Sequence, residues 1–452
     1  MKLVYGVKDK PSFGKTLVFA LQQLLAILAA TIAVPAIIGN GMSQSAALFG
    51  AGVGTIVYLL FTKFRSPVFL GSSFAFLGSM AAAFAGGVSA SAGYLGMIIG
   101  AVMAGLVYVV IALIVKFAGV KWISKLMPAV VIGPTVAIIG LSLSGNAIGD
   151  AVGVAKDGSA FVMNAHAGVC LICALVTLAV TMLCSVFGKK MMKMIPFIIG
   201  IVSGYIVASI FTIIGNNTGI DALKIIDYSA FSNLRWVPSF TFETAFSGGY
   251  DFGDAGSIAS YIGTIAAAYV PVAFVVFAEH IADHKNISTI IEHDLLEDPG
   301  LHRTLLGDGV GSMVGAFFGG CPNTTYGESV GCVAITGNAS ISTIFITAIY
   351  CIILSFFQPF VAFVNSIPSC IVGGVCIALY GFIAVSGLKM LQPVDLNDNR
   401  NLFVVAAILV CGIGGLELRL GSVTISAIAT ALIVGILVNV LFNRRTAEEK
   451  AE

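Results

Sequence analysis

Residues 319–331 read GGCPNTTYGESVG and place one carboxylate, Glu328, among glycine, proline, asparagine and threonine. Long apolar stretches flank this segment, so we expect it to lie at membrane depth. Irregular backbone is tolerated there only where it is buried in protein or lines a cavity. An ionisable group at mid-bilayer depth costs about 2.5–3.5 kcal/mol or more, and such groups mark substrate or proton sites. The segment therefore predicts a broken membrane span that carries a functional acid.

A second acid, Glu279, lies in the apolar run YVPVAFVVFAEHIADH of residues 269–284. Hydrophobic residues make up 58% of the 452 residues and charged residues only 10%. This balance is typical of a polytopic membrane protein and excludes an ordinary soluble domain. The net charge of +1 gives no reason to expect a nucleic-acid partner. We therefore predict an all-α membrane protein whose main solvent is the lipid bilayer.

Twelve apolar stretches have about the length needed to cross a bilayer. They fall near residues 17–38, 46–62, 91–118, 122–143, 166–187, 193–214, 255–282, 304–320, 339–364, 367–386, 401–416 and 421–442. Two further stretches, 69–84 and 321–337, are too short or too polar to assign by hydropathy. If both cross, 19 of the 23 Lys and Arg residues fall on one side; if neither does, the division is 14 against 9. Basic residues concentrate on the cytoplasmic side, so we predict fourteen crossings with both termini cytoplasmic.

The two halves of the chain resemble each other. Residues 127–145 read MPAVVIGPTVAIIGLSLSG, and residues 367–387 read IPSCIVGGVCIALYGFIAVSG, with Pro and Gly at the same spacing. Each half has seven predicted spans, an odd number, so the second half enters the membrane from the opposite side. This is the inverted repeat common among secondary transporters. Chance similarity between apolar helices punctuated by Pro and Gly is the alternative.

The short stretches 69–84 and 321–337 are the third span of each half. Both are rich in small, polar and turn-forming residues. We expect each to be extended at first and helical afterwards, so that free N–H groups of a half-helix point into a cavity. Backbone groups near Phe74 and Gly327 are the expected donors. The alternative is a pair of close helix contacts through small residues, which leaves Glu328 unexplained.

Glu279 and Asp283 are four residues apart and share a helix face, which Asn286 continues. Two nearby acids in a low-dielectric site do not both ionise cheaply, and this suits a site that takes up and releases a proton. Asp283 has an alternative role, which is to accept a hydrogen bond from a neighbouring span.

Other polar residues have simpler interpretations. His280 and His284 fall on other faces of the same helix, so we interpret them as packing or interfacial residues. Asp308 lies near the predicted cytoplasmic end of 304–320, where a helix cap or a snorkelling group is expected. Cys170 and Cys173, two of nine cysteines, have CxxC spacing, but we interpret them as lying on one face of a membrane helix. We expect no metal and no cofactor.

Two carboxylates, backbone N–H groups and the rings of Phe74, Tyr326 and Tyr380 describe a site for a small, flat, neutral molecule. A planar amide heterocycle fits, because its N–H groups donate to carboxylates, its carbonyls accept from the main chain and its faces lie against rings. An anion would favour positive charge, and no predicted span has Lys or Arg in its core.

Five segments resemble the nucleobase–cation symporter family (nucleobase–ascorbate transporters), which includes bacterial uracil permeases and xanthine and ascorbate transporters. They are FLGSSFAF at 69–76, AEHIADH at 278–284, DLLEDPGLHRTLLGDGVGSMVGAFFGG at 294–320, PNTTYGES at 322–329 and IPSCIVGGVCIALYGFI at 367–383. The similarity extends from about residue 14 to 444. It implies fourteen segments in two inverted repeats, with a short antiparallel strand pair in the third and tenth spans.

The resemblance also implies two domains. The expected divisions are core 1–118 and 255–364, gate 119–214 and 365–443, an extracellular connection 215–254 and a cytoplasmic tail 444–452. A homodimer through the gate domains is a further expectation.

Within the family, an acid of the eighth span and the residue after the Tyr-Gly of the tenth bind the base. Here these are Glu279 and Glu328. Relatives that carry purines usually have Gln at the second position, so Glu328 favours the uracil branch. The family's backbone contacts correspond to Phe74 and Gly327. Its remaining site positions correspond to Ala30, Ser73, Tyr326 and Tyr380.

Two departures concern coupling. Uracil permeases usually read EHxGH in the eighth span, where this chain has Asp283 at the last position, as in the purine branch. The usual Gln-His of the first span is Gln22-Gln23 here. We expect a proton-coupled uracil importer of a bacterial cytoplasmic membrane, with Glu279 or Asp283 binding the proton and the core moving against the gate as an elevator.

Three alternatives stay open at this point. The first is a carrier of xanthine or another purine, which Asp283 favours. The second is an intramembrane enzyme that uses paired acids, although no nucleophile–base set or metal-ligand cluster supports it. The third is an anion exchanger or channel of the same architecture, against which the acidic site argues.

Overall fold

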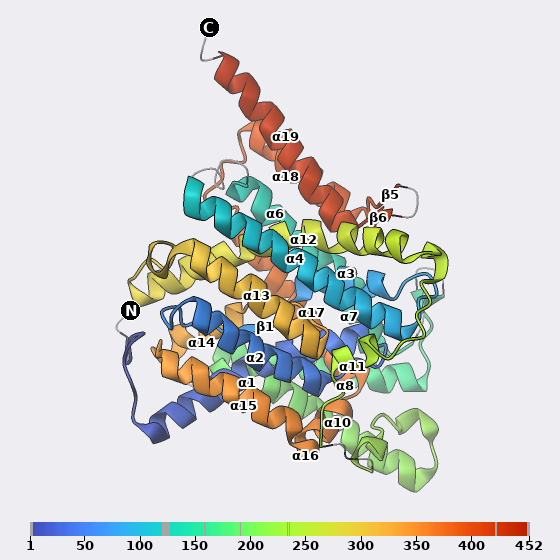
Figure 1. The fold of residues 1–452 in the computed structure, drawn as a ribbon. Coiled ribbons are helices and arrows are strands. Elements are labelled where there is room, and N and C mark those ends of the chain that lie inside the picture. The colour runs from blue at the N-terminus through green and yellow to red at the C-terminus, as the bar shows by residue number, and fades with distance from the viewer. Residues whose placement is uncertain are drawn as a thin grey trace.

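The computed structural model describes most of the chain. The described residues are 3–119, 127–154, 156–157, 160–189, 191–232, 234, 236–420 and 423–449. The start of the predicted span 122–143 and the last residues of the predicted tail 444–452 lie outside them. The described chain is mainly helical, with three two-stranded sheets (Figure 1).

The first half of the chain runs from α1 to α10. Its elements are α1 (Phe13–Ile38), α2 (Gln44–Phe61), β1 (Leu70–Ser72), the 3-10 turn η1 (Phe74–Phe76), α3 (Leu77–Ala83), α4 (Ala90–Ala118), α6 (Ala129–Ser142), α7 (Ser144–Val152), β2 (Lys156–Asp157), β3 (Ala160–Phe161), α8 (Ala165–Phe187), α9 (Met191–Met194) and α10 (Pro196–Thr218). Side chains cap several N-termini: Ser43 accepts from the N–H of Ala46, and Ser89 from that of Ala92.

Short elements connect the halves, and long helices return in the second. The elements are η2 (Asp221–Leu223), η3 (Tyr228–Phe231), α11 (Thr241–Ala245), η4 (Gly253–Ala255), α12 (Ile258–Ile291), the π-helical turn η5 (Leu296–Gly300), α13 (Leu301–Gly319), β4 (Asn323–Thr325), α14 (Gly327–Thr336), α15 (Ile341–Phe356), α16 (Gln358–Asn365), α17 (Ser369–Lys389), α18 (Asn399–Ile413), β5 (Leu418–Leu420), β6 (Val423–Ile425) and α19 (Ala427–Glu449). Pro128 and Pro368, equivalent in the proposed repeat, lie at the N-caps of α6 and α17.

Eight helices among the described residues are long and apolar enough to cross a membrane: α1, α2, α4, α6 with α7, α8, α10, α12 and α17. The bent pair α15–α16, with 79° between its helices, brings the number to nine. Helix α18 and the apolar part of α19, Ala427–Phe442, are shorter apolar helices. The expectation of a helical polytopic membrane protein is confirmed, while the number of fourteen crossings stays a prediction.

The stretches 69–84 and 321–337 are each a short strand followed by a helix, as expected. Strands β1 and β4 pair antiparallel, with Leu70 opposite Thr325 and Ser72 opposite Asn323, and each strand leads into a helix. Thr55 of α2 satisfies the adjoining backbone, because its hydroxyl donates to the carbonyl of Leu70 at 3.1 Å and accepts from the Leu70 N–H at 3.0 Å. Gly71 is required in the pair, since a Cβ there would collide with the Tyr326 ring. The short-strand prediction is therefore confirmed.

Small residues allow the helices around the strand pair to approach closely. Helix α13 packs against α2 and α4, and α2 also packs against α15. At the α2–α13 crossing, a Cβ on Gly50 would meet the backbone of Gly315. Close approach through Gly is the usual way in which membrane helices gain van der Waals contact. A second set of packings joins α6 to α17, α8 to α10 and α17, and α18 to α19 and α6.

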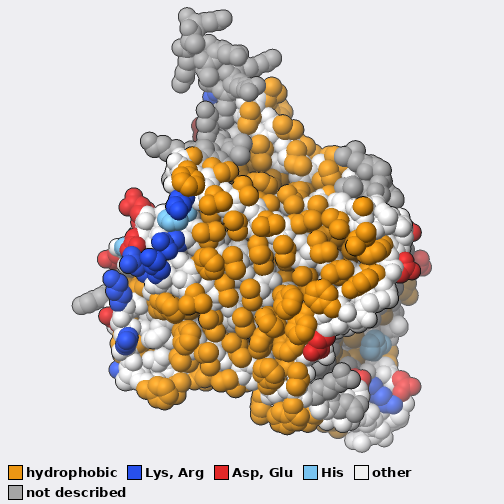
Figure 2. Space-filling model, viewed as in Figure 1, with side chains coloured by type: hydrophobic (Ala, Val, Ile, Leu, Met, Phe, Trp, Pro, Cys, Tyr) orange, Lys and Arg blue, Asp and Glu red, His pale blue; other side chains and the backbone are white. Residues whose placement is uncertain are grey.

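Figure 2 shows one broad face covered by hydrophobic side chains. Lysine and arginine side chains gather along one margin of this face, on the side of the N-terminus, and acidic side chains lie at both margins. In Figure 1 the long helices of this face run between the two margins. An apolar band with charged margins fits a protein embedded in a bilayer.

Candidate functional site

A cavity of about 370 Å³ lies where the broken spans meet α12, α6 and α17. Helix α12 contributes Glu279, Ala282, Asp283 and Asn286, and the end of β4 with the start of α14 contributes residues 324–328. Ala26 of α1, Val136 and Ile139 of α6, and Leu379, Phe382, Ile383 and Ser386 of α17 complete much of the wall. The cavity is therefore largely apolar with a few converging polar groups, as expected of a small-molecule site.

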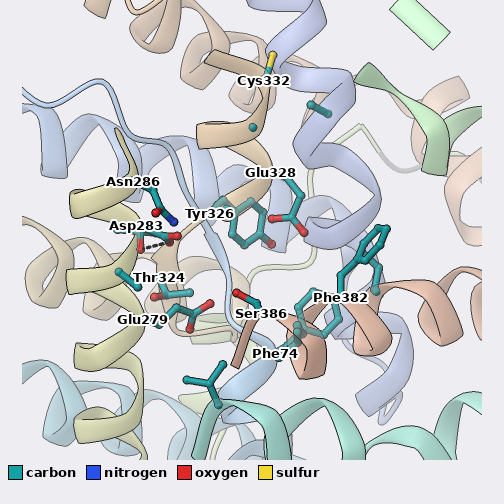
Figure 3. A pocket seen from close by; sticks show the side chains of 18 of the residues that line it. Phe74, Glu279, Asp283, Asn286, Thr324, Tyr326, Glu328, Cys332, Phe382 and Ser386 are labelled. Atoms are coloured by element: carbon teal, nitrogen blue, oxygen red, sulfur yellow. Dashed lines mark hydrogen bonds between the residues drawn. The ribbon is translucent and has the colours of Figure 1, made fainter. Parts of the chain in front are cut away.

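The two acids predicted to form the site both line this cavity. Glu279 projects from α12 and Glu328 from α14, and Figure 3 shows their side chains together with those of Phe74, Tyr326 and Ser386 around one space. Both carboxylates are half-buried, so part of each side chain faces the cavity. Two acceptor groups from different helices are thus available to one ligand.

Asp283 has a protein partner at the cavity wall. Its Oδ2 accepts a hydrogen bond from the Thr325 hydroxyl at 2.7 Å, and its side chain is buried (Figure 3). Glu279, Asp283 and Asn286 share the cavity-facing side of α12, as their spacing predicted. The hydrogen-bonding role foreseen as an alternative for Asp283 is therefore present. It does not exclude a role in proton binding, since one carboxylate oxygen is left for other partners.

Two helix starts adjoin the cavity. Gly327 and Glu328 form the first turn of α14, where backbone N–H groups are not used by the helix and the helix dipole is positive. Phe74 and Ala75 open the 3-10 turn that leads into α3 on the other side of the strand pair. Both predicted donor positions, Phe74 and Gly327, line the cavity. The site thus combines carboxylate acceptors with backbone donors.

Tyr326 lines the cavity with its ring while its hydroxyl is used by the protein. The hydroxyl donates to the carbonyl of Ser72 at 2.9 Å. This bond fixes the ring beside the strand pair.

Three predicted site residues lie behind the cavity wall rather than on it. Ala30 is buried in α1, where Ala26, one turn earlier, reaches the cavity instead. Ser73 is buried, and its N–H donates to the carbonyl of Pro322 at 2.9 Å. Tyr380 packs edge-on against Phe74, with ring centroids 5.8 Å apart. Helical periodicity explains why Tyr380 does not line the cavity. Positions 379, 382, 383 and 386 form the cavity face of α17, and position 380 is rotated about 100° around the helix from position 379.

Sequence reasoning missed several lining residues. Phe382 and Ser386 follow the i, i+3, i+4, i+7 pattern of one α17 face, a signal that was available but not used. Lys193 lines the cavity from the short helix α9 and is exposed, although no Lys was expected there. It belongs to a break between α8 and α10 rather than to the core of a span.

The prediction for Asp308 needs correction, and of the two interpretations of the α12 histidines the structure supports packing. Asp308 is neither a cap nor a snorkelling group, because it lies about two turns into α13 and is only 1% exposed. Its Oδ2 is 2.6 Å from Nδ1 of His280. His280 and His284 are fully buried and not interfacial. Glycines along α13 bring α2 and α4 close and place this turn deep in the protein.

No group of three or more His, Cys, Asp or Glu side chains in the described part of the chain is placed to hold a metal ion. Cys170 and Cys173 are buried in α8 with free thiols.

Comparison with known proteins identifies the family of this chain. The family model described as "Permease family" matches residues 14–420. The chain is 39% identical to a uracil permease of Bacillus caldolyticus over 98% of this chain and 96% of that protein. It is 36% identical to a uracil permease of Bacillus subtilis (strain 168), over 99% and 97% respectively.

A solved structure has a similar fold. The transmembrane domain of a cyanobacterial bicarbonate transporter, BicA, aligns with a TM-score of 0.61 at 15% identity, covering 94% of this chain and 96% of that one. At this identity the likeness shows the fold alone. The relatives similar in sequence are named permeases, so the protein is a membrane transporter and not an enzyme. The chain belongs to this permease family, as its sequence motifs indicated.

Proposed function

We propose that this protein imports uracil by proton symport across a bacterial cytoplasmic membrane. The observation that carries the proposal is the convergence of Glu279, Glu328 and two helix starts on one cavity. Uracil is a flat ring with alternating N–H donors and carbonyl acceptors, which matches this set of groups. The names of the similar permeases support the same substrate.

The base binds with its ring edge toward the two acids. Its N–H groups donate to Glu279 and Glu328, and its carbonyls accept from backbone N–H groups at Gly327 and Phe74. One ring face lies against Tyr326. Asp283 and Glu279 are the site acids that take up the proton, because they share one side of α12 and two adjacent acids in a poorly hydrated site favour a shared proton.

Movement occurs between a core (1–118 and 255–364) and a gate (119–214 and 365–443). Helix packing supports this division: α1, α2 and α4 pack mainly with α12, α13 and α15, while α6 and α8 pack mainly with α10, α17 and α18. The two sets touch chiefly through α1 and α12. A carrier in which one rigid set slides against the other needs such a limited interface.

The packing also supports two inverted repeats. The contact of α2 with α15 has a counterpart in that of α13 with α4, and α8 with α10 corresponds to α18 with α19. The contact of α8 with α17 corresponds to that of α18 with α6. Fourteen segments with both termini cytoplasmic belong to this proposal. On that orientation the cavity faces inward, since its lining extends to Lys193, Ile335 and Met390, at the basic end of the molecule.

The test is uptake of labelled uracil by proteoliposomes under an imposed proton gradient, inside alkaline. The proposal predicts accumulation that collapses when an ionophore dissipates the gradient. Uptake that is indifferent to the proton gradient contradicts proton symport, and an absence of uracil uptake contradicts the substrate.

A xanthine or purine carrier is the second candidate, favoured by an acid at position 283 that bonds to Thr325. Competition decides between the two. Excess unlabelled uracil is expected to block labelled uracil uptake, while excess xanthine leaves it nearly unchanged. The reverse order of potency identifies a purine carrier. An anion exchanger with a similar fold is disfavoured by two carboxylates in the cavity, and bicarbonate that competes with uracil would revive it.

A further inference from the structure

A buried acid–base pair lies behind α12, on the side away from the cavity. Nδ1 of His280 is 2.6 Å from Oδ2 of Asp308, and the two side chains are 0% and 1% exposed. Nε2 of His280 is 3.0 Å from the Thr304 hydroxyl. The proposed transport mechanism does not use this pair.

The hydrogen bonds around His280 determine where its protons lie. The Thr304 hydroxyl donates to the carbonyl of Leu301 at 3.1 Å, so its oxygen is left to accept from Nε2 of His280. Nε2 therefore carries a proton, as assigned from the hydrogen-bond network. Nδ1 faces the Asp308 carboxyl, and a 2.6 Å contact requires one proton between the two atoms. The pair thus shares a single exchangeable proton, either on Nδ1 or on the carboxyl oxygen.

In both arrangements the pair has no net charge. Removing the shared proton leaves a negative charge in a fully buried place, where the other carboxyl oxygen, Oδ1, has no donor within the described part of the chain. An unpaired buried charge costs several kcal/mol, so the neutral, proton-loaded pair is the favoured form in this conformation.

The titratable groups around the pair come from four helices. Tyr108 faces Asp308 from α4, and Tyr58 approaches from α2 beside His284 of α12. Glu279 and Asp283 of α12, one and three residues from His280, carry the carboxyl groups on the cavity side together with Glu328 of α14. A proton on the pair lowers the cost of negative charge on Glu279 or Asp283. Because such coupling is reciprocal, a negative charge on Glu279 or Asp283 raises the proton affinity of the pair by the same free energy.

We propose that His280 and Asp308 form a proton-binding site of the carrier, separate from the cavity acids and coupled to them through the charge at Asp308. This inference rests on the proposed proton symport. Loading forms an O–H or N–H bond with a proton taken from water, and unloading returns that proton to water on the other side of the membrane. No other reactant is needed.

The test compares two transport modes in proteoliposomes. Uracil exchange, with equal uracil on both sides and no gradient, needs no net proton movement. Accumulation under a proton gradient needs net proton movement. A gradient of about one pH unit supplies ~1.4 kcal/mol per proton carried, which supports about tenfold accumulation of uracil. We expect Asp308→Asn and His280→Gln to retain exchange but to accumulate about tenfold less uracil than the unmodified protein at a gradient of about one pH unit, because one carried proton is lost while the cavity acids keep theirs. Ser312→Ala is the control that keeps both modes, because Ser312 is a buried α13 residue one turn after Asp308 and lines, with Asp308 and Tyr108, a small cavity separate from the substrate cavity.

Accumulation by Asp308→Asn equal to that of the unmodified protein overturns the inference. Failure of the unmodified protein to accumulate uracil instead contradicts the proposed function, so the two failures are distinguishable. Histidine nitrogen NMR of the unmodified protein covers the case in which neither variant folds. We expect one buried ring protonated on Nε2, from His280, and one protonated on Nδ1, from His284, whose Nδ1 is 2.8 Å from the His280 carbonyl. If no buried ring is protonated on Nε2, His280 does not share a single proton with Asp308 and the inference is overturned.

Discussion

Helix α12 has two polar sides that differ in how their hydrogen bonds are used. The side facing the cavity carries Glu279 and Asp283, whose carboxylates have only partial protein partners and open space before them. The side facing α2 and α13 carries His280 and His284, both buried and bonded to protein groups at each ring nitrogen. Polar groups left with unused capacity beside a cavity are available to a ligand, whereas groups satisfied within the protein fix the helix or hold a proton. One helix thus separates substrate contact from internal support.

The largest effect is expected from neutralising a cavity acid. Glu279→Gln or Glu328→Gln removes a charge-assisted hydrogen bond to the base, worth about 1.5–3 kcal/mol, so uracil affinity falls about 10- to 100-fold. Thermal stability in detergent stays close to that of the unmodified protein, because no protein partner of the removed charge is lost. Calorimetric titration with uracil measures the affinity. Glu243→Gln, in α11 outside the cavity, is the control, and equal affinity in all four proteins would remove the carboxylates from the site.

The next effect concerns the strand pair that supports the site. Gly71→Ala places a methyl group against the Tyr326 ring, and overpacking of this kind typically costs about 1–3 kcal/mol. We expect a lower melting temperature together with weaker uracil binding, since Tyr326 and Gly327 move with the strand. Gly78→Ala, where a Cβ meets open space, is the matched control. A Gly71→Ala protein with normal stability and affinity would show that the strand pair does not position the site.

The packed side of α12 is expected to respond in stability and not in affinity. Tyr58→Phe removes the hydroxyl that lies 2.7 Å from Nε2 of His284 and 2.6 Å from the Ser66 hydroxyl. A buried group deprived of its partner costs about 1–3 kcal/mol, so the melting temperature falls. Uracil affinity stays within about threefold, a change of under 1 kcal/mol. Affinity that falls as far as in Glu279→Gln would erase the distinction between the two sides.

The sequence was enough to predict features that depend on local chemistry, and it was not enough where the rotation of a helix decides which residues meet. Small and turn-forming residues in 69–84 and 321–337 predicted both breaks, and the four-residue spacing of Glu279 and Asp283 predicted their common side. The pairing of His280 with Asp308 was not foreseen, because two residues 28 positions apart meet only through the way α12 and α13 pack. Tyr380 lies off the cavity wall for a related reason: the way α17 packs against α6 decides which side of α17 faces the cavity.

The smallest effect is expected from the hydrogen bond between Thr325 and Asp283 at the cavity wall. Thr325→Val removes the donor to Asp283 while keeping the side-chain shape, and one such hydrogen bond is worth about 1 kcal/mol. We expect uracil affinity to change by about fivefold or less, and its dependence on pH to shift because Asp283 loses a bond that its charged form prefers. Titrations at several pH values measure both. An unchanged pH dependence would indicate that Asp283 is not among the groups that bind the proton.

The location of the bound base tests the central claim most directly. A structure of the protein with 5-bromouracil locates the ligand by the anomalous scattering of its bromine atom. The account predicts a single bromine position inside the cavity lined by Glu279, Glu328 and Phe74. A bromine position outside that cavity, with the two carboxylates free of ligand, would contradict it.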